Sequence, residues 1–428
     1  MKKAIVIGSG AGGATVAKEL QGNFDVTVIE AGKSFHPFTA NLSSVEKVKR
    51  TGVLFNERLI QTIFPTMRIG KAGNGMVLVK GVGYGGSTTI SAGNAIRMDG
   101  DLKVLGIDLD AEFREISQEI PVFTEHQKTW HAQTRQAYEI CRRMGLQPEV
   151  TPKMIYPERC IGCGKCILGC PRGAKWDSRR YLNQALRKGA QLISNSKVQQ
   201  IVLEHGQATG VVASCGWHRR FYPADLVVLA AGGLGSPIIL QNSRIKCEDR
   251  LFVDPVLCVA ARIDDSQQNG EIPMPFIVRK EHFIISPYFD FLSYFFNRNW
   301  HYPAGSIYSL MIKLADTNSG SVSSHGAKKA LSDMDTERLK EGVEICKQIF
   351  RFLGKKDSEM FLGTLNAGHP GGMLPLTKKE ARTFHHSHLP GNLYVSDATL
   401  FPQSLGNPPI LTIVAMAKRV SRVCLEYA

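Results

Sequence analysis

Long apolar runs are missing from this sequence: none of its 428 residues lies in a stretch of about 18 uninterrupted apolar residues, the length that suggests a membrane-spanning helix. A signal peptide is also missing, because strand-like residues begin as early as Lys3. The chain contains no internal repeat and no low-complexity tract. These absences argue against a membrane-spanning protein and predict a cytoplasmic one.

Acidic residues are in the minority. The 52 Lys and Arg residues outnumber the 38 Asp and Glu residues by 14, and the isoelectric point is near 9.3. The basic residues stand in scattered pairs and not in one long run, so we expect no nucleic acid partner. A solvated basic surface explains most of this excess, while an acidic partner or substrate and peripheral contact with an anionic membrane stay open.

Cysteine is not abundant, with ten residues, and six of the ten are isolated from one another. The other four form one run in which successive cysteines are separated by two, two and three residues, and Pro171 closes it. These four are Cys160, Cys163, Cys166 and Cys170. The spacing is that of bacterial ferredoxins, in which cysteine thiolates hold an iron-sulfur cluster. The run therefore predicts a 4Fe-4S cluster.

Three alternatives to this interpretation stay open. Zinc also binds cysteines two residues apart, although usually through two such pairs on separate knuckles. In two-cluster ferredoxins the fourth cysteine of a run serves the other cluster, and this chain has no second run. Either Cys170 or one of the isolated cysteines therefore supplies the fourth ligand. Finally, the cluster can be purely structural and carry no electrons.

The N-terminus has the pattern of a dinucleotide-binding unit. An apolar strand at residues 4–7 leads into a glycine turn, and a helical pattern follows at residues 14–20. The turn contains Gly8, Gly10 and Gly13, and a second strand at residues 25–30 ends in Glu30. Glycines let the backbone approach a pyrophosphate at the helix N-terminus, and the acid accepts hydrogen bonds from ribose. The motif alone does not choose between NAD and FAD.

Two later segments have a related pattern. Residues 226–237 form an apolar strand that runs into a glycine turn at Gly232 and a new helix. Near the C-terminus, residues 392–402 precede Pro408 and a helical pattern at residues 410–419. The sequence therefore predicts one nucleotide-binding domain assembled from the start, middle and end of the chain.

With these segments the chain resembles the glucose-methanol-choline (GMC) oxidoreductases, FAD enzymes that mostly oxidise alcohols. The resemblance covers about half of the residues and rests on the glycine turn with Glu30, residues 81–88, 230–237 and 367–372, and the ending from Asp397 to Pro408. The chain departs from the family pattern at Ser91, where asparagine is common, and at Met373, where threonine is usual. It is also shorter than typical members.

The resemblance implies FAD as cofactor and an α/β fold, with a Rossmann-like FAD-binding domain and an α+β substrate domain that contains an antiparallel sheet. It implies His369 as the catalytic base and Asn407 as the residue that orients the substrate oxygen. Further cofactor contacts are expected at Gly83, Gly86, Ser87, Gly232, Asp397 and Pro408.

Five segments follow from this interpretation. Residues 1–100, 196–254 and 366–428 are expected to form the FAD-binding domain, residues 101–195 a helical insertion that carries the four cysteines, and residues 255–365 the substrate domain. Residues 40–80 and 97–150 mix helical patterns with loops, and the apolar spacing of residues 335–354 predicts a helix. The aromatic stretch at residues 283–296 reads as a core segment, with a substrate channel or a membrane contact as alternatives.

Two redox motifs in one chain suggest a dehydrogenase and not a peroxide-forming oxidase. Hydride from a CH–OH group of a small hydroxyl-bearing substrate would pass to FAD, and single electrons would leave through the 4Fe-4S cluster to ferredoxin or another one-electron acceptor. The alternative is a flavin and iron-sulfur electron-transfer subunit of a larger redox complex. A homo-oligomer stays open as well.

Overall fold

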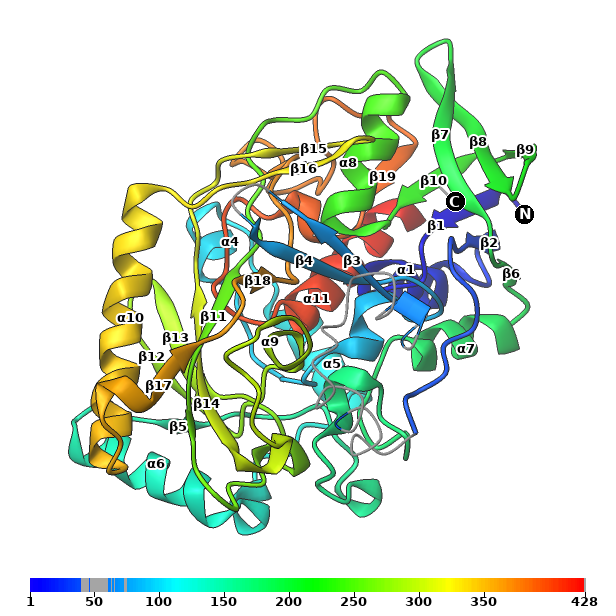
Figure 1. The fold of residues 1–428 in the computed structure, drawn as a ribbon. Coiled ribbons are helices and arrows are strands. Elements are labelled where there is room, and N and C mark those ends of the chain that lie inside the picture. Colours follow the sequence, from blue (N-terminus) through cyan, green and yellow to red (C-terminus); the bar gives the residue numbers. More distant parts are fainter. Residues whose placement is uncertain (40–45, 47–60, 63, 65, 73–74, 427–428) are drawn as a thin grey trace.

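The molecule contains two main sheets, and the first of them is parallel (Figure 1). The computed structural model describes residues 1–426 except 40–45, 47–60, 63, 65 and 73–74. The sheet runs in the order β19 (Leu393–Val395), β10 (Leu226–Leu229), β1 (Lys3–Ile7), β2 (Asp25–Ile29) and β6 (Gln191–Ile193). All of its pairings are parallel. Strands from the start, middle and end of the chain therefore share one sheet, as the sequence predicted.

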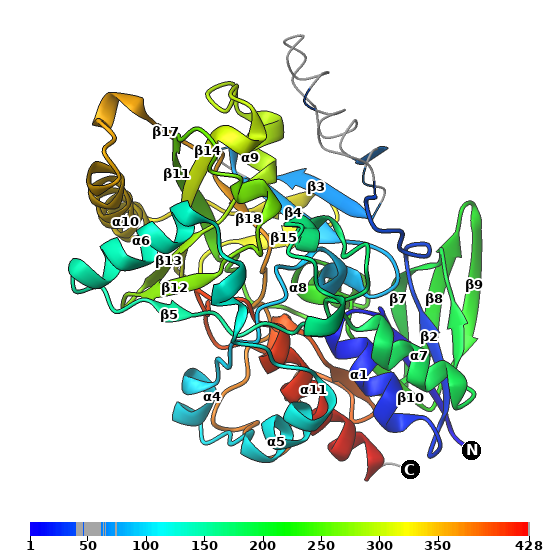
Figure 2. The ribbon, with the colours of Figure 1, turned by 90° about the horizontal axis from the view of Figure 1, so that it is seen from below.

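Helices cover this sheet because its inner strands are apolar on both faces. On one side α1 (Ala11–Leu20) packs against α7 (Arg179–Arg187) and α11 (Ile410–Leu425). Figure 2 shows this layer, with α1 between the other two helices. The helix α8 (Gly232–Asn242) follows β10 directly and packs against β7 (Lys197–Glu204). The architecture is the α/β class expected from the sequence.

The second main sheet is mainly antiparallel and has nine described strands. Its main path runs β3 (Met67–Lys71), β4 (Val77–Gly81), β18 (Asn366–Ala367), β11 (Pro255–Arg262), β14 (Ile307–Leu314), β13 (Phe283–Pro287), β12 (Phe276–Arg279) and β5 (Glu149–Val150). The ninth strand, β17 (Met360–Leu362), pairs with β11. Only the pairing of β18 with β4 is parallel.

The long helix α10 (Asp333–Phe352) packs on β14 and β11 of this sheet, and α6 (Ala132–Arg143) lies beside it (Figure 2). Its predicted position, residues 335–354, is two residues late at each end. A capping box explains the earlier start: the Ser332 side chain accepts from the Asp335 amide, and the Asp335 side chain accepts from the Ser332 amide. No helix in the described ranges is long and apolar enough to cross a bilayer.

The remaining elements surround the two sheets. A three-stranded antiparallel sheet consists of β7, β8 (Gln207–Cys215) and β9 (His218–Pro223). The others are α4 (Gly100–Val104), α5 (Asp110–Glu119), α9 (Phe291–Phe296), β15 (Ser321–Ser323) and β16 (Gly326–Lys328). Of the helical patterns expected at residues 40–80, those at 40–45 and 47–60 lie outside the described residues.

Two of the five expected segments contribute strands to a sheet other than the one the sequence suggests. The strands β3 and β4, in the range 1–100, belong to the antiparallel sheet, and β6, in the range 101–195, is an edge strand of the parallel one. The aromatic stretch at residues 283–296 forms β13 and α9 and is largely buried, as expected for a core segment.

Candidate functional site

One large cavity, of about 490 Å³, lies between the two sheets. Its walls come from the glycine turns of the parallel sheet on one side and from the antiparallel sheet and α9 on the other. Eight of the residues expected to contact a cofactor line it, namely Gly8, Gly10, Glu30, Gly86, Ser87, Gly232, Asp397 and Pro408. The proposed base His369 also lines it. Gly13, Gly83 and Asn407 are not among the residues in its wall.

The glycine turn before α1 leaves open space at the N-terminus of that helix. A Cβ atom built on Gly10 would meet no atom within 4 Å, and no side chain caps the helix there. By contrast, a Cβ on Gly13 would lie 2.0 Å from the Gly8 carbonyl oxygen, and Gly8 itself has a φ of +96°. Gly8 and Gly13 therefore shape the turn, while Gly10 opens it to the cavity. A pyrophosphate fits such a helix N-terminus.

Two carboxylates lie at the ends of strands that face the cavity. Glu30 accepts from the Ser9 amide at 3.0 Å, from the Ser9 hydroxyl at 2.7 Å and from the Gly32 amide at 2.8 Å. Asp397 accepts from the Gly232 amide at 2.8 Å and the Ser236 hydroxyl at 2.5 Å. Burial raises the pKa of Asp397 even though these bonds favour its ionised form.

A charged trio, His369, Asp254 and Lys313, lies in the half of the cavity formed by the antiparallel sheet. Asp254 directly precedes β11, Lys313 is in β14 and His369 follows β18, and these three strands are neighbours. Asp254 Oδ2 lies 3.0 Å from Lys313 Nζ and 3.5 Å from His369 Nδ1. The last distance is at the limit of a hydrogen bond, and Nδ1 has no well-formed partner. Both His369 and Lys313 line the cavity.

The surroundings of this trio set its protonation. Burial lowers the pKa of His369, and the Lys313 ammonium lowers it further, while Asp254 acts in the opposite direction. Burial disfavours the charged form of Asp254, but Lys313, His369 and Ser404 outweigh that cost and hold its pKa below the usual range. His369 is therefore a neutral imidazole near neutral pH, which is the form that accepts a proton.

Asn407 lies one residue before the cavity wall at Pro408. It is buried, and its side-chain Oδ1 has no hydrogen-bond partner. Its amide nitrogen has only a 3.5 Å contact with the Leu405 carbonyl. An unpartnered buried amide oxygen is costly, so the side chain has unused hydrogen-bonding capacity beside the cavity.

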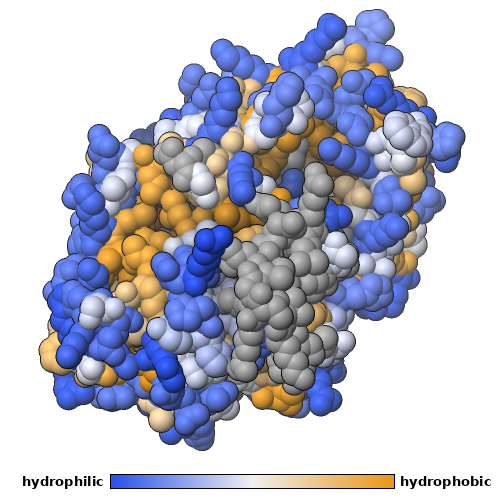
Figure 3. Space-filling view, in the orientation of Figure 1, coloured by the Kyte–Doolittle hydropathy of each residue, from blue (hydrophilic) through white to orange (hydrophobic). Residues whose placement is uncertain are grey.

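An apolar wall completes the antiparallel-sheet side of the cavity. It contains Tyr288, Phe291, Phe295 and Met311. Figure 3 shows that apolar residues are also exposed on one face of the molecule. Behind the wall, Asp290 accepts from Asn366 at 3.1 Å, and burial raises the pKa of Asp290 to about 6. A wall of this kind can contact the apolar surface of a bound molecule.

The four cysteines of the run line a second, smaller cavity, which we call the cysteine pocket. The turns at residues 157–159 and 165–168 and left-handed glycines at Gly162 and Gly164 bring them together. Burial raises the pKa of the Cys166 thiol to about 12, which argues against an isolated nucleophilic thiolate. Within the described residues, no group of three or more His, Cys, Asp or Glu side chains is arranged to hold a metal ion. The four cysteines expected to bind a 4Fe-4S cluster thus surround one pocket, but their side chains are not arranged to hold a metal ion.

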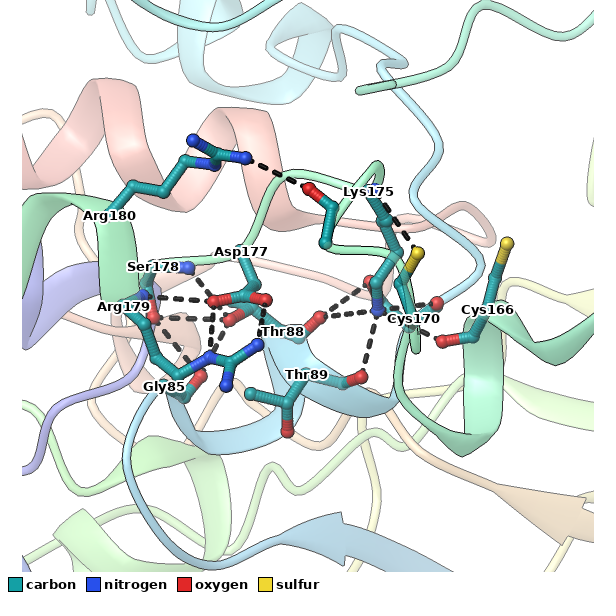
Figure 4. Close-up of polar contacts among 12 residues, drawn as sticks. Gly85, Thr88, Thr89, Cys166, Cys170, Lys175, Asp177, Ser178, Arg179 and Arg180 are labelled. Atoms are coloured by element: carbon teal, nitrogen blue, oxygen red, sulfur yellow. Dashed lines mark hydrogen bonds and ion pairs between the residues drawn. The ribbon is translucent and has the colours of Figure 1, made fainter. Parts of the chain in front are cut away.

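Two buried lysines lie near the cysteine pocket, Lys175 in its wall and Lys153 outside it. Lys175 Nζ donates to the carbonyl oxygens of Thr88, Thr89 and Ser91 at 2.9 Å each and of Cys166 at 3.0 Å (Figure 4). Burial lowers the pKa of Lys153 to about 7 and that of Lys175 to about 8. Because Thr88 and Ser91 line the large cavity, Lys175 ties the cysteine loop to the cavity wall.

Sequence reasoning missed Asp254, Lys313 and the two buried lysines. Asp254 is 59 residues from Lys313, and neither lies in a recognisable motif. The local sequence offered one hint, the pair Asp254–Pro255, because Asp is one of the few residues that tolerate a left-handed backbone. In the structure Asp254 has a φ of 51° immediately before a strand. Lys153 and Lys175 flank the cysteine run within ten residues, but a lysine near a motif is normally a surface residue.

The two sheets, the glycine turns and the shared cavity define a nucleotide-cofactor oxidoreductase fold. The chain belongs to the GMC oxidoreductase family, an FAD-binding family of oxidoreductases, whose family model matches residues 3–257. This result confirms the family, the fold class and the FAD cofactor expected from the sequence.

Relatives are similar over nearly the whole chain. An uncharacterized protein of Methanocaldococcus jannaschii, MJ1450, is 28% identical over 426 residues, which cover 98% of this chain and 99% of that protein. Among solved structures, pyridoxine 4-oxidase from Mesorbium loti has a TM-score of 0.71 at 16% identity and covers 99% of both chains. A formate oxidase of Aspergillus oryzae, described for its FAD modification, also has a TM-score of 0.71, at 12% identity, and covers 100% of this chain and 98% of its own.

Proposed function

We propose that this chain is a dehydrogenase that oxidises a CH–OH group of a small molecule with FAD as hydride acceptor. In this proposal Cys160, Cys163, Cys166 and Cys170 would hold a 4Fe-4S cluster, which would supply single-electron transfer to a ferredoxin-like carrier. The observation that carries the first half is the single cavity that joins the glycine turns to the charged trio. Oxidation of one alcohol to a carbonyl gives up the hydroxyl proton and a hydride. The two electrons of the hydride would reduce two molecules of a one-electron carrier, and its proton would be released to solvent.

The residues of the chain have separate roles in this reaction. FAD, when bound, supplies the hydride acceptor. Gly10 and the N-terminus of α1 would hold its pyrophosphate and Glu30 its ribose, and Gly86, Ser87, Gly232, Asp397 and Pro408 in the cavity wall would hold the rest. Gly83, outside the wall, would shape the turn before Ser87 by accepting from the Gly86 amide. His369 takes the hydroxyl proton at Nε2, because Nδ1 faces Asp254. Asn407 orients the substrate oxygen through the amide group that has no other partner.

The cysteine pocket supports the second half of the proposal. The four thiols surround one small cavity, and Ile167 and Leu168, within the cysteine run, line the large cavity. Only the loop of the cysteine run would therefore separate a cluster in the cysteine pocket from a flavin in the large cavity. Such proximity favours electron exit through the cluster over reaction of the flavin with oxygen.

Anaerobic purification followed by visible and EPR spectra and metal analysis tests the proposal. We expect flavin bands, about four irons per chain and flavin bleaching when an alcohol substrate is added without oxygen. Zinc in place of iron would remove the electron-exit half. Bleaching that requires a second protein would favour the electron-transfer subunit, and fast peroxide formation that does not depend on the cysteines would indicate an oxidase.

A further inference from the structure

Five lysines are buried in the part of the chain that the structure describes: Lys153, Lys175, Lys313, Lys329 and Lys418. The last three each have a carboxylate oxygen within 3.0 Å of Nζ. Lys153 and Lys175 make no ion pair with any described carboxylate. Lys175 lines the cysteine pocket and Lys153 lies near it, so the two buried lysines without an ion pair are in one region of the molecule.

Lys175 is held by oxygen atoms that carry no net charge. Its Nζ donates to four backbone carbonyls, and its exposed fraction is 2%. The Lys175 side chain is part of the wall of the cysteine pocket, and its own amide lies 3.5 Å from the Cys170 sulfur. Figure 4 shows Lys175 between Cys166, Cys170 and the two threonines.

Lys153 has a similar neutral environment on another side. It is fully buried, and its Nζ donates to the side chain of Asn94 and to the Pro273 carbonyl, the latter at 2.5 Å. Ile155, two residues later, and Ile272, beside Pro273, line the cysteine pocket. Lys153 is therefore one residue layer away from the same space as Lys175.

A buried ammonium group without an anion is unfavourable, because desolvation is not offset by an ion pair. The Asp177 carboxylate also acts on Lys175, but it is held in an ion pair with Arg179 at 2.8 Å. No Asp or Glu lines the cysteine pocket itself, so the anionic candidates in its wall are the four cysteine thiolates. Thiolates gathered on iron carry net negative charge, which two neighbouring buried cations would balance.

We propose that Lys153 and Lys175 are the counter-charges of an anionic iron-sulfur cluster in the cysteine pocket and raise its reduction potential. This inference rests on the proposed function. Reduction adds one electron and one negative charge to the cluster, so nearby buried cations stabilise the reduced form more than the oxidised form. Because both lysines are buried, water screens their charge little, which strengthens this effect. They act on the cluster as positioning residues and do not ligate it.

Arg172 provides a matched control. It also lines the cysteine pocket but is exposed, so water and salt screen its charge. We would measure iron content and the cluster reduction potential, by EPR-monitored titration, for the wild type and the Lys153→Met, Lys175→Met and Arg172→Gln variants. Lys153→Met and Lys175→Met should shift the potential to more negative values, and each shift should exceed that of Arg172→Gln.

The outcomes separate this inference from the proposed function. A wild-type protein without iron removes the cluster and this inference with it. A wild-type cluster whose potential is the same in both lysine variants as in Arg172→Gln overturns the inference and leaves the proposed function intact. If Lys175→Met loses iron, Lys175→Arg is measured next, and a variant that keeps both the iron and the wild-type potential supports the charge role. If both Lys175 variants lose iron, the reduction potential of Lys153→Met, compared with that of Arg172→Gln, decides.

Discussion

His369 is the residue on which the proposed chemistry depends most directly. We expect His369→Gln to retain FAD but to lose about 10²- to 10⁴-fold in the rate of anaerobic flavin bleaching, the usual contribution of a general base. His388→Gln is the matched control, because His388 is exposed and does not line the cavity. Stopped-flow spectroscopy measures both rates. Equal bleaching by the two variants would remove His369 from the mechanism.

Lys313 should control the pH at which that base works. Because burial and the Lys313 ammonium both lower the pKa of His369, the neutral form persists below pH 6.5 and the acid limb of flavin reduction should lie below that pH. Lys313→Met removes one of these influences, so the pKa of His369 rises and the acid limb moves to higher pH. The pH profile of the bleaching rate, in samples checked for FAD content, measures this shift. A shift to lower pH, or none, would contradict the prediction.

His126 should make stability depend on pH. The ring is fully buried, accepts from the Trp130 indole at Nδ1 at 3.0 Å and lies 2.9 Å from the Thr151 carbonyl at Nε2, so it is neutral with the proton on Nε2. Burial lowers its pKa from 6.5 to about 4. The unfolded chain therefore binds a proton below pH 6.5 that the folded chain does not, and stability falls as pH falls through this window.

The size of this effect is on the order of 2 kcal/mol between pH 6.5 and pH 5, at about 1.4 kcal/mol for each pH unit. Urea unfolding of the wild type and the His126→Gln variant at pH 7 and pH 5 measures it. The stability difference between the two proteins should shrink at pH 5, because the variant has no group to protonate at this position. A constant difference would mean that His126 titrates equally in both states.

The glycine turn before α1 offers a test at the scale of an element. Gly10→Ala should leave the fold unchanged, because the added Cβ meets no protein atom within 4 Å. It should weaken FAD binding, because the Cβ would occupy the space at the N-terminus of α1 that we assign to the pyrophosphate. Gly13→Ala should instead destabilise the chain, since its Cβ would lie 2.0 Å from the Gly8 carbonyl oxygen. Thermal unfolding without cofactor and FAD titration distinguish the two effects. Unchanged FAD affinity in Gly10→Ala would place the pyrophosphate elsewhere.

Elements with a strong local pattern were the ones that the sequence predicted. The apolar strands before Gly8 and Gly232 and the apolar spacing of α10 depend on neighbouring residues, so the sequence shows them directly. The start of α10 was misplaced because Ser332 and Asp335 form a capping box that the apolar spacing does not reveal. The trio of His369, Asp254 and Lys313 depends on three neighbouring strands, and no local pattern contains that adjacency.

At the scale of the whole molecule, the net charge of +14 should govern encounters with an acidic electron carrier. If reduced protein passes electrons to a ferredoxin-like acceptor, the second-order rate should fall as ionic strength rises, because salt screens the attraction. A small neutral acceptor dye serves as control, since its reduction should change little over the same range. Stopped-flow measurement at several salt concentrations compares the two. A salt-independent protein reaction would argue against an acidic partner.

The parallel sheet has a consequence for synthesis of the protein on the ribosome. β1 is translated first, yet its neighbour β10 comes more than 200 residues later, and the outer strand β19 comes only at Leu393–Val395. At about 5 to 20 residues per second, roughly 20 to 80 seconds separate the first strand from the last. β1 can pair with β2 early in that interval, but its other edge has no native partner until β10 is translated. We therefore expect nascent chains to need protection by chaperones, and flavin to enter only after release.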